Sequence, residues 1–204
     1  MKIDWFQHYA RKTKMVLDKK SFKNNLKTDK PYIQLLKKHL APNAKILECG
    51  CGLARTAFSM TYHGFCVVAV DYNKNILQIV KQSAKNLDLS KKIKLLYLDF
   101  FDINKKFKPN SFNCITHQGV IEHYPKKEIK KILKKQLKIA PTLIFSVPLK
   151  TKFNEKKYFI DKLYRNLWAK EFWLNNIFKE FNVAETKVVR QRSDNLLVVI
   201  KRFD

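Results

Sequence analysis

Short apolar, β-branched segments alternate with amphipathic segments along most of this chain. The strand-like segments are residues 45–49, 65–70, 92–98, 112–117, 142–148, 182–191 and 195–201. Helix-like segments are predicted at 2–20, 30–40, 53–63, 73–88, 125–139 and 168–181. Strands separated by helices favour an α/β fold, with helices on both faces of a mostly parallel, seven-stranded sheet. The last two strands are close in sequence and predict an antiparallel hairpin.

The turn after the first strand contains two of the chain's four glycines, Gly50 and Gly52, in the stretch ECGCGLA. Glycines let the backbone bend sharply and approach a ligand, and the helix N-terminus that follows offers free N–H groups. Because ligands bind at the carboxyl ends of parallel strands, the turn predicts a ligand site. The dinucleotide fingerprint GxGxxG would need a glycine at position 55, where the bulky Arg55 argues against NAD or FAD.

Acidic residues end the next two strands. Asp71 follows FCVVAV, and Asp99 follows KLLYL and precedes Phe100. A carboxylate at the end of the second strand can accept hydrogen bonds from both hydroxyls of a ribose. A single strand-end acid is as often a turn-former. Since the carboxyl ends of parallel strands share one edge, the glycine turn and the two acids together predict a nucleoside pocket.

The ordered stretches ECGCGLA, VVAVDYN, LYLDFFD, FKPNSFNCITHQGVIEHY and LIFSVP resemble the successive motifs of class I S-adenosylmethionine-dependent methyltransferases. The resemblance covers residues 44–148 and implies a Rossmann-like sheet. It implies S-adenosylmethionine as cofactor and S-adenosylhomocysteine as product.

The resemblance assigns roles to individual residues. Around the methionine portion of the cofactor it places the first turn, made of Glu48, Gly50, Cys51 and Gly52. Asp71 would hold the ribose hydroxyls, and Tyr72 would lie against the adenine. Asp99 and Phe100 would meet the adenine amino group, while Gln118 and Gly119 would line the sulfonium end.

The sequence departs from the family pattern at three positions. Ala54 replaces the third glycine of the first motif, and Asn113 replaces an acid that often precedes the fourth strand. Some relatives bind a divalent metal through an acid three residues before the Glu-His pair. That position is Gly119 here, so no metal site is predicted on Glu122 and His123.

A base is needed only where the methyl acceptor arrives protonated. His123 is the leading candidate because it follows the fourth strand, and a structural role in the loop before Pro125 is the alternative. His117, Glu122 and Tyr124 are weaker candidates. Tyr9 either closes over the cofactor as a lid or packs on the sheet with its aromatic neighbours.

The residues predict one domain over 1–204. It has an N-terminal helical extension or lid at 1–40 and a cofactor-binding core at 44–148. Residues 149–204 are assigned to an acceptor-site insertion, the last helix and the hairpin.

No [DN]PPY motif follows the fourth strand and no Pro-Cys pair occurs, which argues against amino-group methylation of bases or glutamine and against 5-methylcytosine formation. The basic, aromatic insertion suits a small anionic acceptor, with contacts expected from Lys150, Lys152, Arg165 or Trp168.

The formal net charge of +25 leaves a second class of acceptor open. Such a field attracts RNA, although lysines spread along the chain are typical of solvated helix faces. The alternatives are therefore an RNA or protein methyltransferase and a non-catalytic cofactor-binding module. Neither a signal-peptide-like start nor a membrane-spanning stretch is found, so a cytoplasmic protein is expected.

Overall fold

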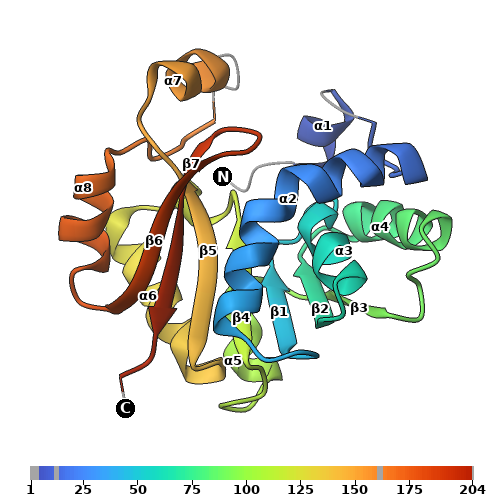
Figure 1. The fold of residues 1–204 in the computed structure, drawn as a ribbon, viewed down its shortest axis with the longest axis horizontal. Coiled ribbons are helices and arrows are strands. Elements are labelled where there is room, and N and C mark those ends of the chain that lie inside the picture. Colours follow the sequence, from blue (N-terminus) through green and yellow to red (C-terminus); the bar gives the residue numbers. More distant parts are fainter. Residues whose placement is uncertain (1–4, 12–13, 160–162, 204) are drawn as a thin grey trace. The chain divides into compact units, whose positions relative to one another are not determined.

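The computed structural model describes residues 5–11, 14–159 and 163–203 (Figure 1). The chain divides into two compact units, unit 1 (Met1–Asp102) and unit 2 (Ile103–Asp204). Each unit has its own strands and helices. The description of residues 1–204 as one domain stays a prediction.

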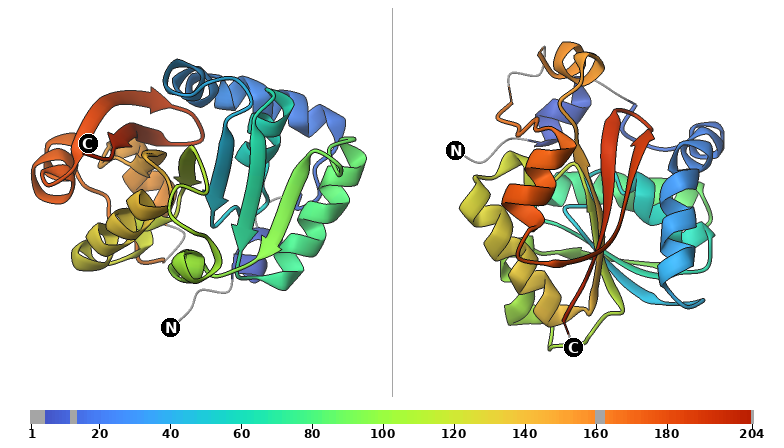
Figure 2. Two further views of the ribbon diagram at one scale, coloured as in Figure 1. Left: turned by 90° about the horizontal axis from the view of Figure 1, so that it is seen from below. Right: turned by 60° about the vertical axis from the view of Figure 1, so that its left-hand side comes forward.

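Unit 1 is built from three parallel strands with helices between them. In chain order its elements are α1 (Trp5–Ala10), α2 (Lys19–His39), β1 (Lys45–Cys49), α3 (Arg55–Tyr62), β2 (Cys66–Asp71), α4 (Lys74–Asn86), β3 (Ile93–Tyr97) and the 3-10 turn η1 (Phe100–Asp102). The strands lie side by side in the order β3-β2-β1 (Figure 2). Glu48 pairs with Ala69, and Asp71 pairs with Tyr97, so the strands end at one edge.

Helix packing in unit 1 follows the apolar faces read from the sequence. α3 packs against β2 and α2, while α4 packs against β2 and β3. Asn73 caps α4, because its side chain accepts a hydrogen bond of 3.1 Å from the Ile76 amide.

The N-terminal helices differ from the prediction. α1 ends at Ala10, and α2 runs without interruption from Lys19 to His39, where helices over 2–20 and 30–40 were expected. Asp18 starts α2, because its side chain accepts a hydrogen bond of 2.7 Å from the Ser21 amide. Pro31 lies inside α2 rather than in a first turn, so the helix continues although proline supplies no N–H there.

Unit 2 holds the other four strands. Its elements are α5 (Ile103–Lys106), β4 (Cys114–Gln118), the 3-10 turn η2 (Ile121–His123), α6 (Lys126–Ile139), β5 (Thr142–Pro148), α7 (Lys152–Phe159), α8 (Lys170–Phe172), the π-helical segment η3 (Trp173–Phe178), β6 (Asn182–Arg190) and β7 (Asp194–Lys201). β4 and β5 are parallel, and β7 is antiparallel to both β5 and β6. The predicted α/β class with seven strands and an antiparallel C-terminal hairpin is confirmed.

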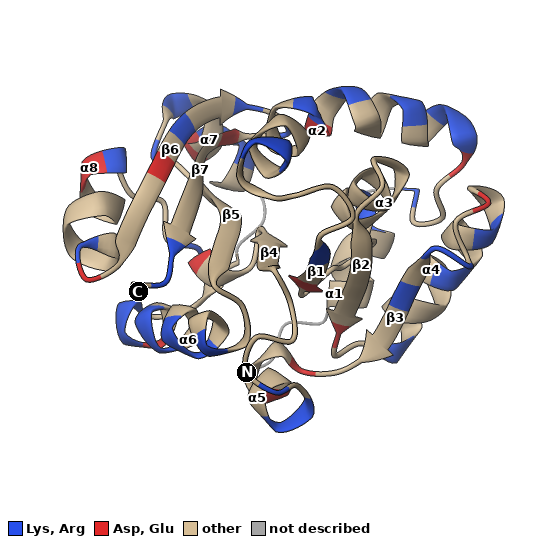
Figure 3. Ribbon diagram, turned by 60° about the horizontal axis from the view of Figure 1, so that its bottom comes forward, with Lys and Arg blue, Asp and Glu red and all other residues tan. Residues whose placement is uncertain are grey.

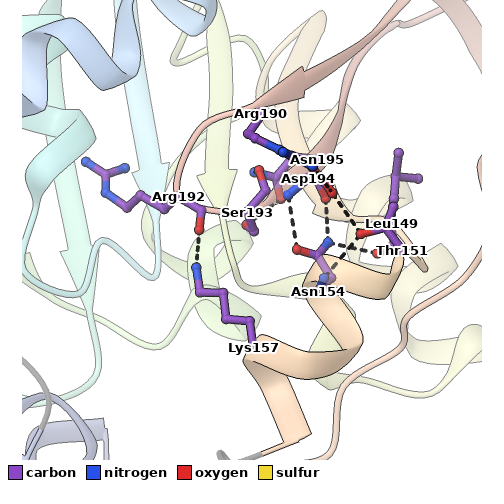
Figure 4. A network of polar contacts seen from close by, with 9 residues as sticks. All are labelled: Leu149, Thr151, Asn154, Lys157, Arg190, Arg192, Ser193, Asp194 and Asn195. Carbon is purple, nitrogen blue, oxygen red and sulfur yellow. Dashed lines mark hydrogen bonds and ion pairs between the residues drawn. The ribbon is translucent and has the colours of Figure 1, made fainter.

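The insertion after β5 contains a helix, α7, that was not predicted from the sequence. A buried asparagine fixes this helix to the β6–β7 turn (Figure 4). The Asn154 side-chain amide donates hydrogen bonds to the carbonyls of Leu149 (2.8 Å) and Asp194 (2.7 Å) and accepts one from the Asp194 amide (3.0 Å). The Thr151 hydroxyl donates to the Asp194 carboxylate, which also holds Arg190. Hydrogen bonds, and not the packing of an apolar helix face, therefore hold α7 in position.

Candidate functional site

The turn between β1 and α3 has an unusual backbone. Gly50, Gly52 and Ala54 all have positive φ, at 64°, 51° and 53°. The Cys51 amide donates a hydrogen bond of 2.9 Å to the Val70 carbonyl, which ties the turn to β2. Alternating left-handed residues turn the chain sharply at the strand's carboxyl end, which explains why glycine is kept at two of these positions.

Asp71 connects the end of β2 to this turn. Its carboxylate accepts hydrogen bonds of 2.9 Å from the amides of Gly52 and Asn73. The side chain is buried, and burial raises its pKa, with the amides acting in the opposite direction and Asp99 adding a smaller increase. The structure thus brings together the first two predicted ligand motifs, which lie 19 residues apart.

The third motif follows β3. The Asp99 carboxylate accepts a hydrogen bond of 3.1 Å from the Phe101 amide and thereby starts η1. Phe100 is buried, and its ring stacks on that of Phe101 at 4.5 Å between centroids. Tyr72 is half-buried in the turn between β2 and α4. Tyr72, Asp99 and Phe100 therefore follow neighbouring strands at the same edge as Asp71.

Glu48 lies at the carboxyl end of β1 in a buried cluster of acidic groups. Burial is the main reason that its pKa rises to about 8, and the carboxylates of Asp29 and Asp71 raise it further. Among the described residues, none donates a hydrogen bond to its Oε2 atom. A buried carboxylate oxygen without a donor favours a bound cation or ammonium group.

Sequence reasoning missed the polar residues behind Glu48. Asp29 of α2 accepts hydrogen bonds from the Ser59 hydroxyl (2.8 Å) and the Asn25 amide (3.2 Å). Asn25 also donates to the Arg55 carbonyl at 2.7 Å, at the start of α3. The available signal was the presence of Asn25 and Asp29 on the apolar face of an amphipathic helix, where polar residues need partners.

Tyr9 of α1 reaches the glycine turn. A Cβ atom added at Gly52 would lie 2.5 Å from the Tyr9 hydroxyl, so a larger residue there would force the Tyr9 side chain to shift. Burial is the largest cause raising the pKa of Tyr9, and the acidic groups of the site add to it. Tyr9 thus lies over the glycine turn and also contacts the rings of Trp5 and His8, so its predicted role as a lid stays a prediction.

In unit 2, the residues after β4 form a second candidate cluster. Gln118 ends β4, and Gly119 follows with φ of 70°. Glu122 and His123 lie in η2, and both side chains are almost fully buried. The Gln118 side-chain nitrogen is buried and has no hydrogen-bond acceptor within the described part of the chain, which leaves a donor for a ligand.

Arg165 from the insertion completes this cluster. Its Nε lies 4.0 Å from Glu122 Oε1, and its guanidinium stacks 3.8 Å from the Tyr158 ring centroid. Burial raises the pKa of Glu122 to about 7, with Arg165 opposing, and burial lowers the pKa of His123 to about 4. His123 Nδ1 lies 2.7 Å from the Tyr164 carbonyl, so this nitrogen carries the proton in neutral imidazole and Nε2 keeps its lone pair.

The other basic and aromatic candidates have different environments. His117 is fully buried, stacks on Phe145 at 4.6 Å, and has a pKa lowered to about 3 by burial, so it is a core residue. The ring of Trp168 packs on that of Phe172, with 4.7 Å between their centroids. Lys150 and Lys152 have exposed side chains at the start of the insertion.

Two further observations apply to residues 5–11, 14–159 and 163–203. No three His, Cys, Asp or Glu side chains in these ranges are grouped so as to hold a metal ion. None of the helices there combines the length and apolar character needed to cross a bilayer.

Residues 46–140 match the family model described as a methyltransferase domain. An uncharacterised protein of Methanocaldococcus jannaschii is 31% identical over 74 residues, which are 36% of this chain and 26% of that protein. The chain therefore matches only about a quarter of the length of this curated relative.

Solved structures share the fold over most of the chain. The PH0226 protein of Pyrococcus horikoshii has a TM-score of 0.74 at 15% identity and full coverage of both chains. The magnesium protoporphyrin IX methyltransferase of Synechocystis with bound SAH gives 0.69 at 15% identity, covering 88% of this chain and 83% of that one. The geranyl diphosphate C-methyltransferase of Streptomyces coelicolor gives 0.61 at 10% identity, with coverages of 86% and 81%.

Proposed function

We propose that this chain, which has the class I methyltransferase fold and a methyltransferase domain at residues 46–140, transfers the methyl group of S-adenosylmethionine to a small-molecule acceptor. The observation that carries the proposal is the hydrogen bond from the Gly52 amide to Asp71, which joins two ligand motifs at one strand edge. Structural neighbours described with bound SAM or SAH support this choice of cofactor.

The residues of unit 1 fit such a cofactor. Asp71 keeps lone pairs that can accept hydrogen bonds from the ribose hydroxyls. Glu48 Oε2, which lacks a donor among the described residues, can accept one from the ammonium of the methionine portion. Asp99 and Phe100 are assigned to the adenine, with Tyr72 against its ring, and the positive-φ turn of Gly50, Cys51 and Gly52 leaves room for close approach.

S-adenosylmethionine supplies an electrophilic methyl group, so the chain's own residues mainly hold the acceptor in line with it. Orientation of this kind contributes on the order of 7–11 kcal/mol in favourable cases. Gln118 and Gly119 are proposed for the sulfonium end. The Nε2 lone pair of His123 is proposed to take a proton from an acceptor that arrives protonated, because its imidazole is neutral at pH 7.

An anionic acceptor suits the second cluster. Arg165 is nearly buried and lies beside Glu122, whose raised pKa of about 7 leaves the pair with excess positive charge at neutral pH. Lys152 extends this positive charge to the start of the insertion, where Lys150 lies 4.0 Å from the Glu155 carboxylate. A carboxylate or phosphate on the acceptor would be attracted to these groups.

Calorimetric titration with S-adenosylmethionine and S-adenosylhomocysteine tests the cofactor. Wild type and an Asp88→Asn control, changed at an exposed carboxylate, should bind both ligands, whereas Asp71→Asn should weaken binding at least about tenfold. Equal affinities in the two variants, or no binding by wild type, would contradict the proposal. Acceptors are then screened with radiolabelled cofactor among anionic metabolites.

The net charge of +25 motivates RNA as the alternative acceptor. An RNA-modifying enzyme predicts tight RNA binding whose logarithm falls steeply with the logarithm of salt concentration. Weak binding that barely changes with salt favours the small-molecule proposal. Cofactor binding without turnover on either pool would favour a non-catalytic module.

A further inference from the structure

A cavity of about 510 Å³ lies in unit 2, away from the residues that follow β4. Its wall comes from the second half of α6, the connection from η3 to β6, and the chain after β7. Lys201 pairs with Thr142, the first residue of β5, whereas Gln118 pairs with Ser146 near the end of β5. The cavity and the Glu122–Arg165 cluster therefore lie at opposite ends of the strands.

The inner surface of this cavity is largely apolar. Leu137 of α6, Phe181 before β6 and Phe203 after β7 contribute side chains to it. Phe203 is 66% exposed, and Leu137 is half-buried although it lies on the apolar side of α6. Asn182 is the single uncharged polar side chain among the described lining residues, so the wall suits hydrocarbon better than a heteroatom-rich base.

Cations surround this apolar surface. The one lining carboxylate, Glu180, is paired with Lys134 and, at 2.9 Å, with Lys130, and these lysines lower its pKa. Arg202 donates hydrogen bonds to Asn110 (2.9 Å) and to the Leu137 carbonyl (3.4 Å), which tie the chain after β7 to α6 and to the loop before β4.

Two lining lysines are left for a ligand. Lys138 and Lys201 form no ion pair within the described part of unit 2, and both are exposed at the cavity. Figure 3 shows the lysines along α6 close to the chain end that follows β7. An uncompensated pair of cations beside an apolar cavity is complementary to a molecule with one anionic end and one apolar end.

We propose that this cavity binds an amphipathic anion, an aliphatic chain that ends in a phosphate or carboxylate. The chain packs against Leu137, Phe181 and Phe203, and the anionic group contacts Lys138 and Lys201. The volume lies within the range of small-molecule sites. The site is separate from the proposed acceptor residues and does not depend on methyl transfer.

Calorimetric titration of the full chain with octyl phosphate tests the site, with inorganic phosphate and octyl glucoside as probes of the head group and the chain alone. Octyl phosphate should bind at least about tenfold more tightly than either probe, because only it satisfies both halves of the cavity. The Lys138→Glu/Lys201→Glu double variant should lose at least about tenfold in affinity, and Phe203→Ala several-fold. Lys135→Glu, an exposed change on α6 that is not part of the cavity wall, should bind like wild type.

In a second titration, a carboxylate with the same octyl chain replaces octyl phosphate, so that the two head groups are compared. Binding of either compound supports the site. Octyl phosphate binding no tighter than inorganic phosphate would overturn the proposal. The same weakening per substituted lysine in Lys135→Glu and in the double variant would also overturn it, since the effect would then be net charge alone. Binding to anionic lipid vesicles without binding to either octyl compound would assign the surface to membranes and contradict the cavity.

Discussion

The backbone amide of Gly52 donates a hydrogen bond of 2.9 Å to Oδ2 of Asp71. The bond joins the turn after β1 to the end of β2 and leaves the other Asp71 oxygen on the Asn73 amide at the start of α4. One carboxylate thus holds both the β1–α3 turn and the β2–α4 turn of unit 1, and the two amides in turn fix the orientation of the carboxylate. A ligand contact at Asp71 is therefore preorganised by the fold.

Gly52→Ala should destabilise the protein by about 1–2 kcal/mol, because φ of 51° strains an L-residue and the new Cβ would lie 2.5 Å from the Tyr9 hydroxyl. Tyr9→Ala should recover part of that loss, giving a coupling of about 0.5 kcal/mol or more in urea unfolding. Gly64→Ala is the matched control, since φ there is 89° but the nearest atom is 4.0 Å away. Additive effects of Gly52→Ala and Tyr9→Ala would contradict the contact.

Glu48→Gln should stabilise the cofactor-free protein at alkaline pH. The folded pKa of Glu48 is about 8 against an ordinary value of 4.5, so its contribution to stability is full below 4.5 and is lost as pH rises to 8. The loss reaches up to roughly 5 kcal/mol at about 1.4 kcal/mol per pH unit. Urea unfolding at pH 5 to 9 should show a steeper fall for wild type than for Glu48→Gln. Glu171→Gln, at an exposed position, should follow wild type.

His123→Gln should make the stability of the protein less sensitive to acid, whereas Glu48→Gln should make it less sensitive to alkali. The folded pKa of His123 is about 4 against an ordinary value of 6.5, so its contribution is present above 6.5 and is lost as pH falls to 4. The free energy of unfolding of wild type should therefore fall by up to about 3 kcal/mol over this pH range, whereas that of His123→Gln should not. Thermal unfolding at each pH measures the difference. A catalytic role predicts in addition a drop in kcat for His123→Gln at pH 7 without a matching change in cofactor affinity. Unchanged kcat would leave His123 with a structural role.

Asn154→Ala should destabilise unit 2 by about 2–4 kcal/mol, because it removes the side-chain partner of the Leu149 carbonyl and the Asp194 amide, while the Asp194 carbonyl keeps its hydrogen bond from the Leu149 amide. Chemical denaturation measures the loss. Asn104→Ala, at an exposed position of α5, is the matched control and should change stability by less than about 0.5 kcal/mol. A similar small effect at both positions would mean that α7 is held by other contacts.

The core elements could be read from the sequence because their signals are local. β1 and β5 have the predicted limits, since a short β-branched run between turn residues identifies a buried strand. α2 could not be delimited in this way. Its start depends on the Asp18 cap, and its passage through Pro31 contradicts the local preference of proline. Packing of Tyr32, Leu35 and Leu36 in the core stabilises the helix beyond that preference.

The candidate site was predictable to a different extent in the two units. Asp71 and Asp99 were found because strand ends of a parallel sheet must share an edge, whatever the side-chain packing. Arg165 was only one of several basic candidates in the insertion. Its distance of 4.0 Å from Glu122 arises from contacts between residues 43 positions apart, which no local pattern records.

The sequence by itself determined the order of the strands, the sharp turn at Gly50 and Gly52, and the acids at the strand ends. Each of these follows from backbone preference or from periodicity over a few residues. Tertiary structure alone decided that Glu48 titrates near pH 8, that Tyr9 covers Gly52, and that Lys138 and Lys201 border one apolar cavity. These properties depend on burial and on charges brought together from distant parts of the chain, because desolvation and Coulomb energies are set by three-dimensional distance rather than by sequence separation.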